Sequence, residues 1–196
     1  MTKVFIVYHS GYGHTKLQAD AISAGAKSVE GTEVTMLTAE EATENIGQLE
    51  SADAIVFGSP TYMGSASAPM KAFMEASSKP WFEQKWKDKI AGGFTNSGSL
   101  SGDKLATLQQ FSILAAQHGM LWVSLGLPNA TATPDVTSGD PSKVNRIGAY
   151  LGAVLSARES LLADQSRPHP TWQAEETLQH FASTVKAIVT APAEND

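Results

Sequence analysis

The sequence predicts an α/β domain in which helices cover both faces of a parallel sheet. Residues 3–8 form an apolar run rich in β-branched and aromatic side chains, which is typical of a strand buried on both faces. Runs of this kind alternate with segments of helical periodicity as far as residue 124. Strands that alternate with helices form βαβ units, and such units require parallel strands.

Each element follows from its apolar periodicity and from the turn residues that flank it. The expected strands are residues 3–8, 32–37, 54–58, 89–95 and 120–124. The expected helices are residues 15–29, 45–51, a segment that contains Met70, Phe73 and Met74, and residues 105–116. The third helix rests on the i, i+3, i+4 spacing of its apolar residues, and Pro69 suits its first turn.

The last third of the chain is less regular. Residues 126–170 contain many turn formers and predict an irregular C-terminal extension, and residues 171–189 predict a terminal helix. Within the extension, apolar spacing favours a helix over residues 144–162, although Gly148 and Gly152 lower its helical propensity.

Length and composition suit one globular domain, residues 1–196, with 42% hydrophobic and 17% charged residues. A net charge of −6 without a basic run argues against nucleic-acid binding. The chain has no cysteine, and no His/Asp/Glu cluster has metal-ligand spacing, so we expect no disulfide and no metal site. No apolar stretch approaches the roughly 20 residues that span a bilayer. We therefore expect a cytoplasmic protein without membrane insertion.

Three loops at the carboxyl ends of predicted strands are the places where a ligand is expected, because ligands of parallel sheets bind at that edge. The loops are residues 10–15, 58–66 and 95–102, and all are rich in glycine and hydroxyl residues. The second and third carry no charge. Uncharged, backbone-rich loops suit a flat heterocycle with carbonyl and imide edges, although each loop taken singly could be an ordinary turn.

The first loop reads Ser10-Gly11-Tyr12-Gly13-His14-Thr15 between a strand and a helix. The free N–H groups and positive dipole end of a helix N-terminus suit a phosphate, and glycines let the backbone approach the anion. The loop lacks the Gly-Lys-Ser/Thr of a Walker loop and the third glycine of a dinucleotide fingerprint. The alternative from the residues alone is a strand-to-helix turn that binds nothing.

The first loop resembles the FMN-phosphate loop of flavodoxin-like proteins. With Gly58-Ser59-Pro60-Thr61-Tyr62-Met63-Gly64, Trp81, residues 96–102 and His118-Gly119-Met120, the chain is similar to WrbA-type NAD(P)H:quinone oxidoreductases and their NADPH-dependent FMN reductase relatives. This resemblance implies a flavodoxin-like three-layer sandwich with a five-stranded parallel sheet in the order 2-1-3-4-5. It also implies non-covalently bound FMN.

The resemblance also implies roles for individual residues. The expected FMN-binding residues are Ser10, Gly11, Tyr12, Gly13, His14, Thr15, Pro60, Thr61, Tyr62, Met63, Gly64, Asn96, Ser97, Gly98, Ser99, Leu100, Ser101 and His118. The first loop would hold the phosphate, and the other two would line opposite sides of the isoalloxazine ring. His118 matches a histidine near the flavin that a neighbouring subunit sometimes supplies. Tyr12 and Trp81 match aromatic positions that meet the nicotinamide or the quinone, and no side chain is expected to be catalytic because the flavin carries the chemistry.

The implied activity is two-electron transfer from NADH or NADPH to a quinone or similar acceptor, in two half-reactions at one site. The alternatives are a flavodoxin-type electron carrier, or a flavin-binding protein that acts through partners without direct NAD(P)H turnover. A phosphoryl-accepting receiver domain is weaker, because the strand ends lack an acidic cluster. The resemblance implies a homo-oligomer, either dimer or tetramer, while the choice of nucleotide and the physiological acceptor stay open.

The chain departs from the WrbA-type pattern in three places. Leu100 and Ser101 stand at two positions of the third loop where the family usually has glycine, which affects the expected backbone contacts. The segment before Ser51 lacks the long insertion that WrbA-type proteins use in tetramer assembly. Residues 145–152 look more like a segment of other flavodoxin-fold reductases, in which it passes near the flavin.

Overall fold

The computed structural model describes residues 1–128, 145 and 148–156. The predicted terminal helix, residues 171–189, lies outside the described residues, as does much of the predicted extension.

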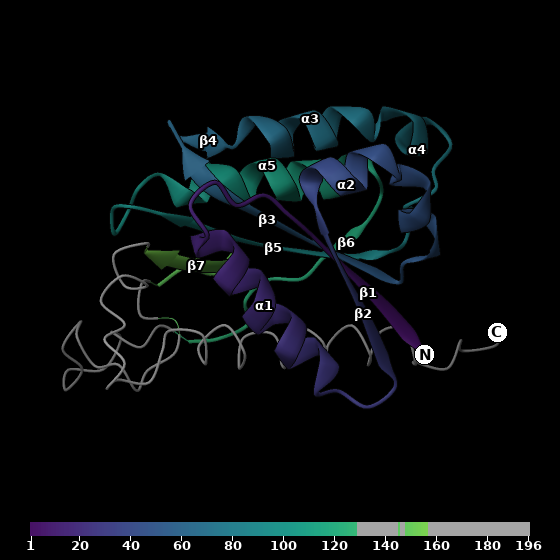
Figure 1. Cartoon of the computed structure of the whole chain (residues 1–196), viewed down its shortest axis with the longest axis horizontal. Helices are drawn as coiled ribbons and strands as arrows, with labels where there is room; N and C mark the ends of the chain where they lie inside the picture. Colours follow the sequence, from purple (N-terminus) through teal and green to yellow (C-terminus); the bar gives the residue numbers. More distant parts are fainter. Residues whose placement is uncertain (129–144, 146–147, 157–196) are drawn as a thin grey trace.

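A parallel sheet forms the centre of the molecule (Figure 1). Its strands are β1 (Thr2–Tyr8), β2 (Thr32–Thr38), β3 (Ala54–Tyr62), β5 (Ile90–Ser97) and β6 (Leu121–Trp122). They are ordered β2-β1-β3-β5-β6, and every neighbouring pair is parallel. The predicted flavodoxin-like order is thus confirmed. The numbering differs only because the short strand β4 (Ser65–Ala66) pairs antiparallel with the end of β3.

Helices lie on both faces of the sheet, which gives three layers (Figure 1). They are α1 (His14–Lys27), α2 (Ala39–Glu44), η1 (Ile46–Ser51), α3 (Ala68–Ala76), α4 (Ser78–Phe82) and α5 (Lys104–Gln117). The apolar side of α1 packs on one face of the sheet, where Ile22 meets Val56 and Phe94 in one buried cluster. On the other face, Phe73 of α3 and Phe111 of α5 join a second cluster. Removal of these side chains from water is the main force that holds the layers together.

The last position of the sheet is filled by two strands that lie far apart in the sequence. β6 pairs with the start of β5, and β7 (Ala153–Ser156) pairs with the second half of β5, over Phe94–Ser97. Residues 153–156 were predicted to belong to an irregular extension, and the apolar spacing favoured a helix. Both predictions are wrong here, because the open edge of β5 offers backbone partners that a strand can use and a helix cannot.

Two contacts explain why the segment that leads into β7 fits against β5. A Cβ atom at Gly152 would lie 2.4 Å from the carbonyl oxygen of Gly93, so only glycine allows the two backbones to approach this closely. The indole N–H of Trp122 donates to the carbonyl of Leu151 at 3.0 Å, which links β6 to the segment that leads into β7.

Candidate functional site

A pocket of about 260 Å³ lies at the carboxyl edge of the sheet. It is lined by Tyr12, His14, Thr15, Pro60, Thr61, Tyr62, Asn96, Ser97 and Gly98. Every lining residue belongs to the set that the sequence predicted, and each of the three predicted loops contributes. The topology explains this convergence, because β1, β3 and β5 are adjacent and parallel, so their carboxyl ends meet.

The first loop forms a helix N-terminus that is open to an anion. Gly13 is the N-cap of α1 with φ 88°, a left-handed conformation that glycine adopts without strain. The hydroxyl oxygen of Ser10 accepts a hydrogen bond from the backbone N–H of Lys16 at 3.1 Å. The first turn of α1 contains no acidic residue. The backbone donors of the first turn therefore face the loop with a positive dipole end and no competing carboxylate.

The second loop is a two-residue hairpin rather than an open loop. Tyr62 pairs with Ser65 across the β3–β4 hairpin, and Met63 and Gly64 occupy its turn with φ of 50° and 77°. Positive φ at both positions is the signature of a type I′ turn, which matches the twist of the strands. Met63 is fully exposed at the tip. Neither Met63 nor Gly64 lines the pocket, although both were expected to bind FMN.

Tyr62 leans from the hairpin over the first loop. Its ring meets that of Tyr12 edge to face, with ring centroids 6.2 Å apart and an interplanar angle of 77°. A Cβ atom at Gly11 would lie 2.7 Å from the Tyr62 hydroxyl oxygen, so a side chain there would push the ring away. Burial raises the pKa of Tyr62, and its phenol is therefore neutral at physiological pH.

Buried hydrogen bonds connect the three loops beneath the pocket. The carboxamide nitrogen of Asn96 donates to the hydroxyl of Thr15 at 2.7 Å and to the side-chain oxygen of Gln18 at 3.0 Å. The Gln18 amide in turn donates to the carbonyl of Thr95 at 3.2 Å. The hydroxyl of Thr61 lies 2.8 Å from those of both Thr95 and Thr107. The loops are therefore held in place by their own side chains.

The remaining residues of the third loop lie beyond the pocket. Ser99, Leu100 and Ser101 are exposed and do not line it. Beneath them, the ammonium of the buried Lys104 donates to the Ser97 hydroxyl at 2.8 Å and to the carbonyls of Ser99 and Leu100 at 2.7 and 2.9 Å.

Sequence reasoning missed four residues that organise this site. They are Gln18, Thr95, Lys104 and Thr107. Gln18 carried a usable signal, since it lies three residues after Thr15 on the buried stripe of α1, where a polar side chain needs a partner. Lys104 carried no usable signal in the sequence, because a lysine in the first turn of a helix is expected to be solvated.

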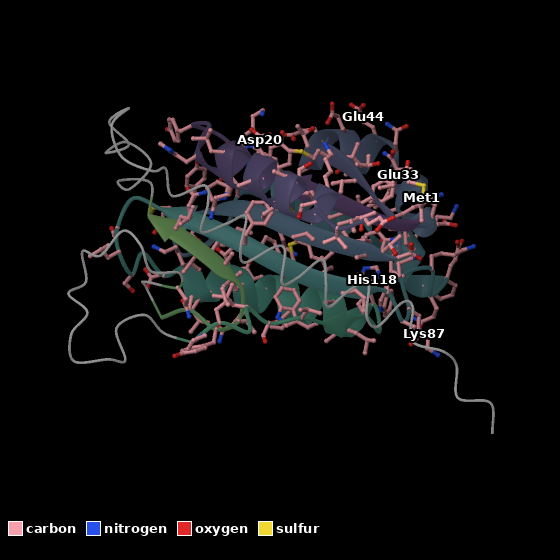
Figure 2. All side chains as sticks on the ribbon, turned by 90° about the horizontal axis from the view of Figure 1, so that it is seen from below. Met1, Asp20, Glu33, Glu44, Lys87 and His118 are labelled. Atoms are coloured by element: carbon pink, nitrogen blue, oxygen red, sulfur yellow. The ribbon has the colours of Figure 1, made fainter. Side chains whose placement is uncertain are left out.

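The structure does not bring His118 to the pocket, which corrects its predicted place beside the flavin. His118 follows α5, a helix of 14 residues that begins at the pocket edge and ends at the opposite edge. Figure 2 shows it beside Lys87, at the end of the molecule where Met1 lies. The side chain is 1% exposed, which also keeps it from reaching a site on a neighbouring subunit.

His118 has a structural role at that edge. Its ring stacks on Trp86 at a centroid distance of 4.3 Å, and its Nε2 lies 2.9 Å from the Ser77 hydroxyl. That hydroxyl already donates to the carbonyl of Met74, so Nε2 carries the hydrogen and donates to Ser77. Burial lowers the pKa of His118 from 6.5 to about 4, and the ring is neutral at pH 7.

Trp81 also lies away from the pocket within one chain. It belongs to α4, whose N-cap residue Ser77 touches His118 at the amino edge of the sheet. Figure 1 shows α4 at the end of the molecule opposite β4 and the first loop. Its indole is half exposed. The βαβ topology accounts for this, because a helix that starts at the carboxyl edge of one parallel strand ends at the amino edge, where the next strand begins.

The pocket has the features that FMN requires. Its described lining contains no Asp, Glu, Lys or Arg, and it includes a helix N-terminus that can accept a phosphate. Its volume lies close to the lower end for small-molecule sites, so a bound flavin would stay partly exposed. Among the described residues, no cluster of His, Asp or Glu could hold a metal ion. No described helix is long and apolar enough to cross a membrane.

Fold and pocket together define the class of flavodoxin-like α/β proteins. Residues 19–132 match the family model of NADPH-dependent FMN reductases, which is more than half of the chain. The chain therefore belongs to this family of FMN-binding, flavodoxin-like oxidoreductases, as its resemblance to WrbA-type proteins predicted.

Two relatives of this chain carry different functional names. Flavodoxin FldP of Pseudomonas aeruginosa is 41% identical over 162 residues, which cover 80% of this chain and 82% of that protein. An NAD(P)H dehydrogenase (quinone) of Methanosarcina acetivorans is 31% identical over 183 residues, covering 78% of this chain and 87% of that protein.

Solved structures support the same family. A flavodoxin, WrbA-like protein from Agrobacterium tumefaciens has 36% identity and a TM-score of 0.70, and the match covers 95% of this chain and 98% of that one. A flavodoxin from the domain Archaea shares only 20% identity at a TM-score of 0.63, over 94% of this chain and 99% of its own, and shows the fold alone.

Proposed function

We propose that this protein is an FMN-dependent oxidoreductase that transfers two electrons from NADH or NADPH to a quinone or similar planar acceptor. The observation that carries the proposal is the pocket at the carboxyl edge, whose described lining contains no Asp, Glu, Lys or Arg and which has exposed aromatic rings at its opening. When bound, FMN accepts a hydride and returns two electrons. The protein supplies placement, stacking surfaces and exclusion of water.

In this proposal the first loop holds the FMN phosphate. The hydroxyls of Ser10 and Thr15 flank the first turn of α1, and Gly13 lets the backbone approach an anion. Because the Thr15 oxygen accepts a hydrogen bond from Asn96, its own proton is available to a phosphate oxygen. Asn96 itself would act mainly by fixing Thr15.

The open side of the pocket suits flat substrates. Tyr12 is 82% exposed and Tyr62 is 38% exposed, and both rings border the pocket. Aromatic rings in this setting can stack on a nicotinamide or a quinone. None of the described residues that line the pocket is acidic, whereas a carrier that docks on basic redox proteins needs acidic residues around its cofactor. This favours small-molecule partners.

A second candidate is a flavodoxin-type electron carrier. The observation that favours it is the 41% identity to Flavodoxin FldP, which exceeds the identity to the quinone dehydrogenase. The two functions share the cofactor site and differ in whether NAD(P)H reduces the bound flavin directly.

Anaerobic absorbance spectroscopy separates these functions. The protein is reconstituted with FMN, desalted and mixed with NADH or NADPH, and a benzoquinone is then added. We expect a retained flavin spectrum that bleaches with at least one nucleotide and recovers with the quinone. A retained flavin that neither nucleotide bleaches supports the carrier, and a protein that retains no flavin contradicts both functions.

Two glycine variants test the phosphate loop with a matched control. Gly13 and Gly31 have φ of 88° and 80°, and neither would bring a new Cβ within 4 Å of another atom. Gly13→Ala and Gly31→Ala therefore impose a similar backbone strain, about 1–2 kcal/mol each. We expect Gly13→Ala to weaken FMN binding at least tenfold and Gly31→Ala to leave it within about twofold. Equal effects of the two variants would contradict the phosphate site.

Several features of the proposed function stay predictions. They are the cytoplasmic location, the homo-oligomeric state, and the absence of nucleic-acid partners and of a metal.

A further inference from the structure

Lys104 is the first residue of α5, yet its side chain points inward and is 3% exposed. Its ammonium donates to three oxygens of the third loop, namely the Ser97 hydroxyl and the carbonyls of Ser99 and Leu100, at 2.7 to 2.9 Å. An ammonium has three donor hydrogens, so it can make all three of these contacts at once. A lysine side chain is almost never buried to this extent unless its charge has polar partners.

These contacts determine the direction of the loop's peptide groups. In a trans peptide, the carbonyl of one residue and the N–H of the next point in opposite directions. The carbonyls of Ser99 and Leu100 point down to the ammonium, so the N–H groups of Leu100 and Ser101 point away from it. Lys104 thereby directs the N–H groups of Leu100 and Ser101 away from the buried side of the loop.

The same contacts account for the side chains that replace glycine in this loop. Neither Leu100 nor Ser101 has a positive φ, so their backbone conformations are open to any residue. The Leu100 side chain is 70% exposed and lies outside the loop. Only Gly102 needs to be glycine, because its φ is 53° and a Cβ atom there would lie 1.9 Å from the Ser97 hydroxyl oxygen.

We propose that Lys104 is the positioning residue of the FMN site: its ammonium holds the backbone of Ser97–Leu100 so that the loop's N–H groups can meet the polar edge of the flavin. This inference rests on the proposed function for its ligand. In this chain a buried cation does what a glycine-rich run does elsewhere in the family, and it leaves Leu100 free on the surface.

Lys89 provides a matched control for removing Lys104. Its ammonium also donates to two backbone carbonyls, those of Glu50 at 2.9 Å and Ala52 at 2.5 Å. Lys89 lies just before β5, whereas Lys104 follows the loop at its other end. Lys89→Met and Lys104→Met therefore remove the same charge and the same kind of contact from opposite edges of the sheet.

The test uses two measurements, one of which needs no flavin. In the FMN-free protein, chymotrypsin cleavage after the exposed Leu100 is compared with cleavage at other sites by mass spectrometry. We expect Lys104→Met to raise this ratio at least tenfold and to weaken FMN binding at least tenfold. Lys89→Met should leave both within about twofold. Ser97→Ala, which removes one of the three ammonium contacts, should act in the same direction with a smaller effect.

The outcomes separate the inference from the proposed function. If both lysine variants raise cleavage after Leu100 equally, or if Lys104→Met binds FMN like the unaltered protein, the inference is overturned. If Lys104→Met does not fold, Lys104→Gln, which removes the charge but keeps an N–H donor, decides through the cleavage ratio, because Ser97→Ala also removes the hydrogen bond from the Ser97 hydroxyl to the carbonyl of Ser99. If the unaltered protein binds no FMN, the proposed function fails, and selective cleavage in Lys104→Met still shows whether Lys104 holds the loop.

Discussion

The carboxamide of Asn96, at the end of β5, donates a hydrogen bond of 2.7 Å to the hydroxyl of Thr15, in the first turn of α1. The two residues are 81 positions apart in the chain, and both are almost fully buried. This bond joins the loop expected to hold a phosphate to the loop expected to meet the flavin ring. It also leaves the Thr15 proton free for a ligand, so the bond helps to shape the pocket.

Asn96→Ala should destabilise the protein by about 3 kcal/mol, because it leaves the buried oxygens of Thr15 and Gln18 without their donor. Urea denaturation of the FMN-free protein measures this loss. The exposed Asn45 is the control, since Asn45→Ala removes only a weak contact of 3.4 Å and should cost less than about 0.5 kcal/mol.

A double-mutant cycle with Thr15→Val isolates the bond itself. We expect a coupling free energy of about 1 kcal/mol between positions 15 and 96. Strictly additive effects would show that the contact contributes nothing to stability.

Stability should fall with acid in a way that depends on His118. Its pKa is about 4 in the folded protein and 6.5 in the unfolded chain, so only the unfolded state takes up a proton between these values. The contribution of His118 is therefore complete above pH 6.5 and is lost as the pH falls toward 4, by up to about 3 kcal/mol. Denaturation series at several pH values measure this loss.

His118→Gln is the control for this pH dependence. Glutamine keeps an N–H donor for Ser77 but does not titrate, so the variant should be less stable at pH 7 and lose less stability between pH 6.5 and 4. If both proteins lose the same free energy over this range, His118 is not the group responsible, and carboxylates account for the slope.

Gly152→Ala should cost about 2 to 3 kcal/mol, because its Cβ would lie 2.4 Å from the carbonyl oxygen of Gly93 and 2.9 Å from Leu108. The variant should loosen β7, which is visible as faster hydrogen exchange over residues 153–156. Gly47→Ala is the control, since its Cβ would meet nothing within 4 Å. A stable Gly152→Ala variant with unchanged exchange would show that β7 is not held as the structure places it.

Tyr12 and Trp81 should behave differently in steady-state kinetics. Tyr12 borders the pocket, so Tyr12→Ala should raise KM for the nucleotide or the quinone by up to about tenfold through lost stacking. Trp81 lies at the other edge of the sheet, so Trp81→Ala should change KM by less than about twofold. A large effect of Trp81→Ala would mean that a second subunit brings this residue to the site.

Much of the fold was predictable because its signals are local. The apolar run at residues 3–8 predicts a buried strand from its composition alone, and the glycine and hydroxyl residues that follow it predict the loop. Parallel strands then require the three loops to meet at one edge. All the residues that line the pocket were predicted on this basis.

The failures have two physical causes. Residues 153–156 have apolar spacing that suits a helix, but the open edge of β5 pairs with them as a strand, and such a long-range partner leaves no mark on the local pattern. His118 and Trp81 lie at or near the ends of helices that run from the carboxyl edge to the amino edge of the sheet, so the predicted topology itself places them away from the pocket.

The sequence by itself determined the alternation of strands and helices, the loops that form the pocket and the family. Only the tertiary structure decided which polar side chains form the buried hydrogen bonds beneath that pocket. Lys104 looks like an ordinary helix residue until the third loop closes over it, and the position of Gln18 on the buried side of its helix does not reveal that its partner is Asn96. Burial is what obliges a polar group to find a partner. Their roles arise from contacts that exist only in the folded chain.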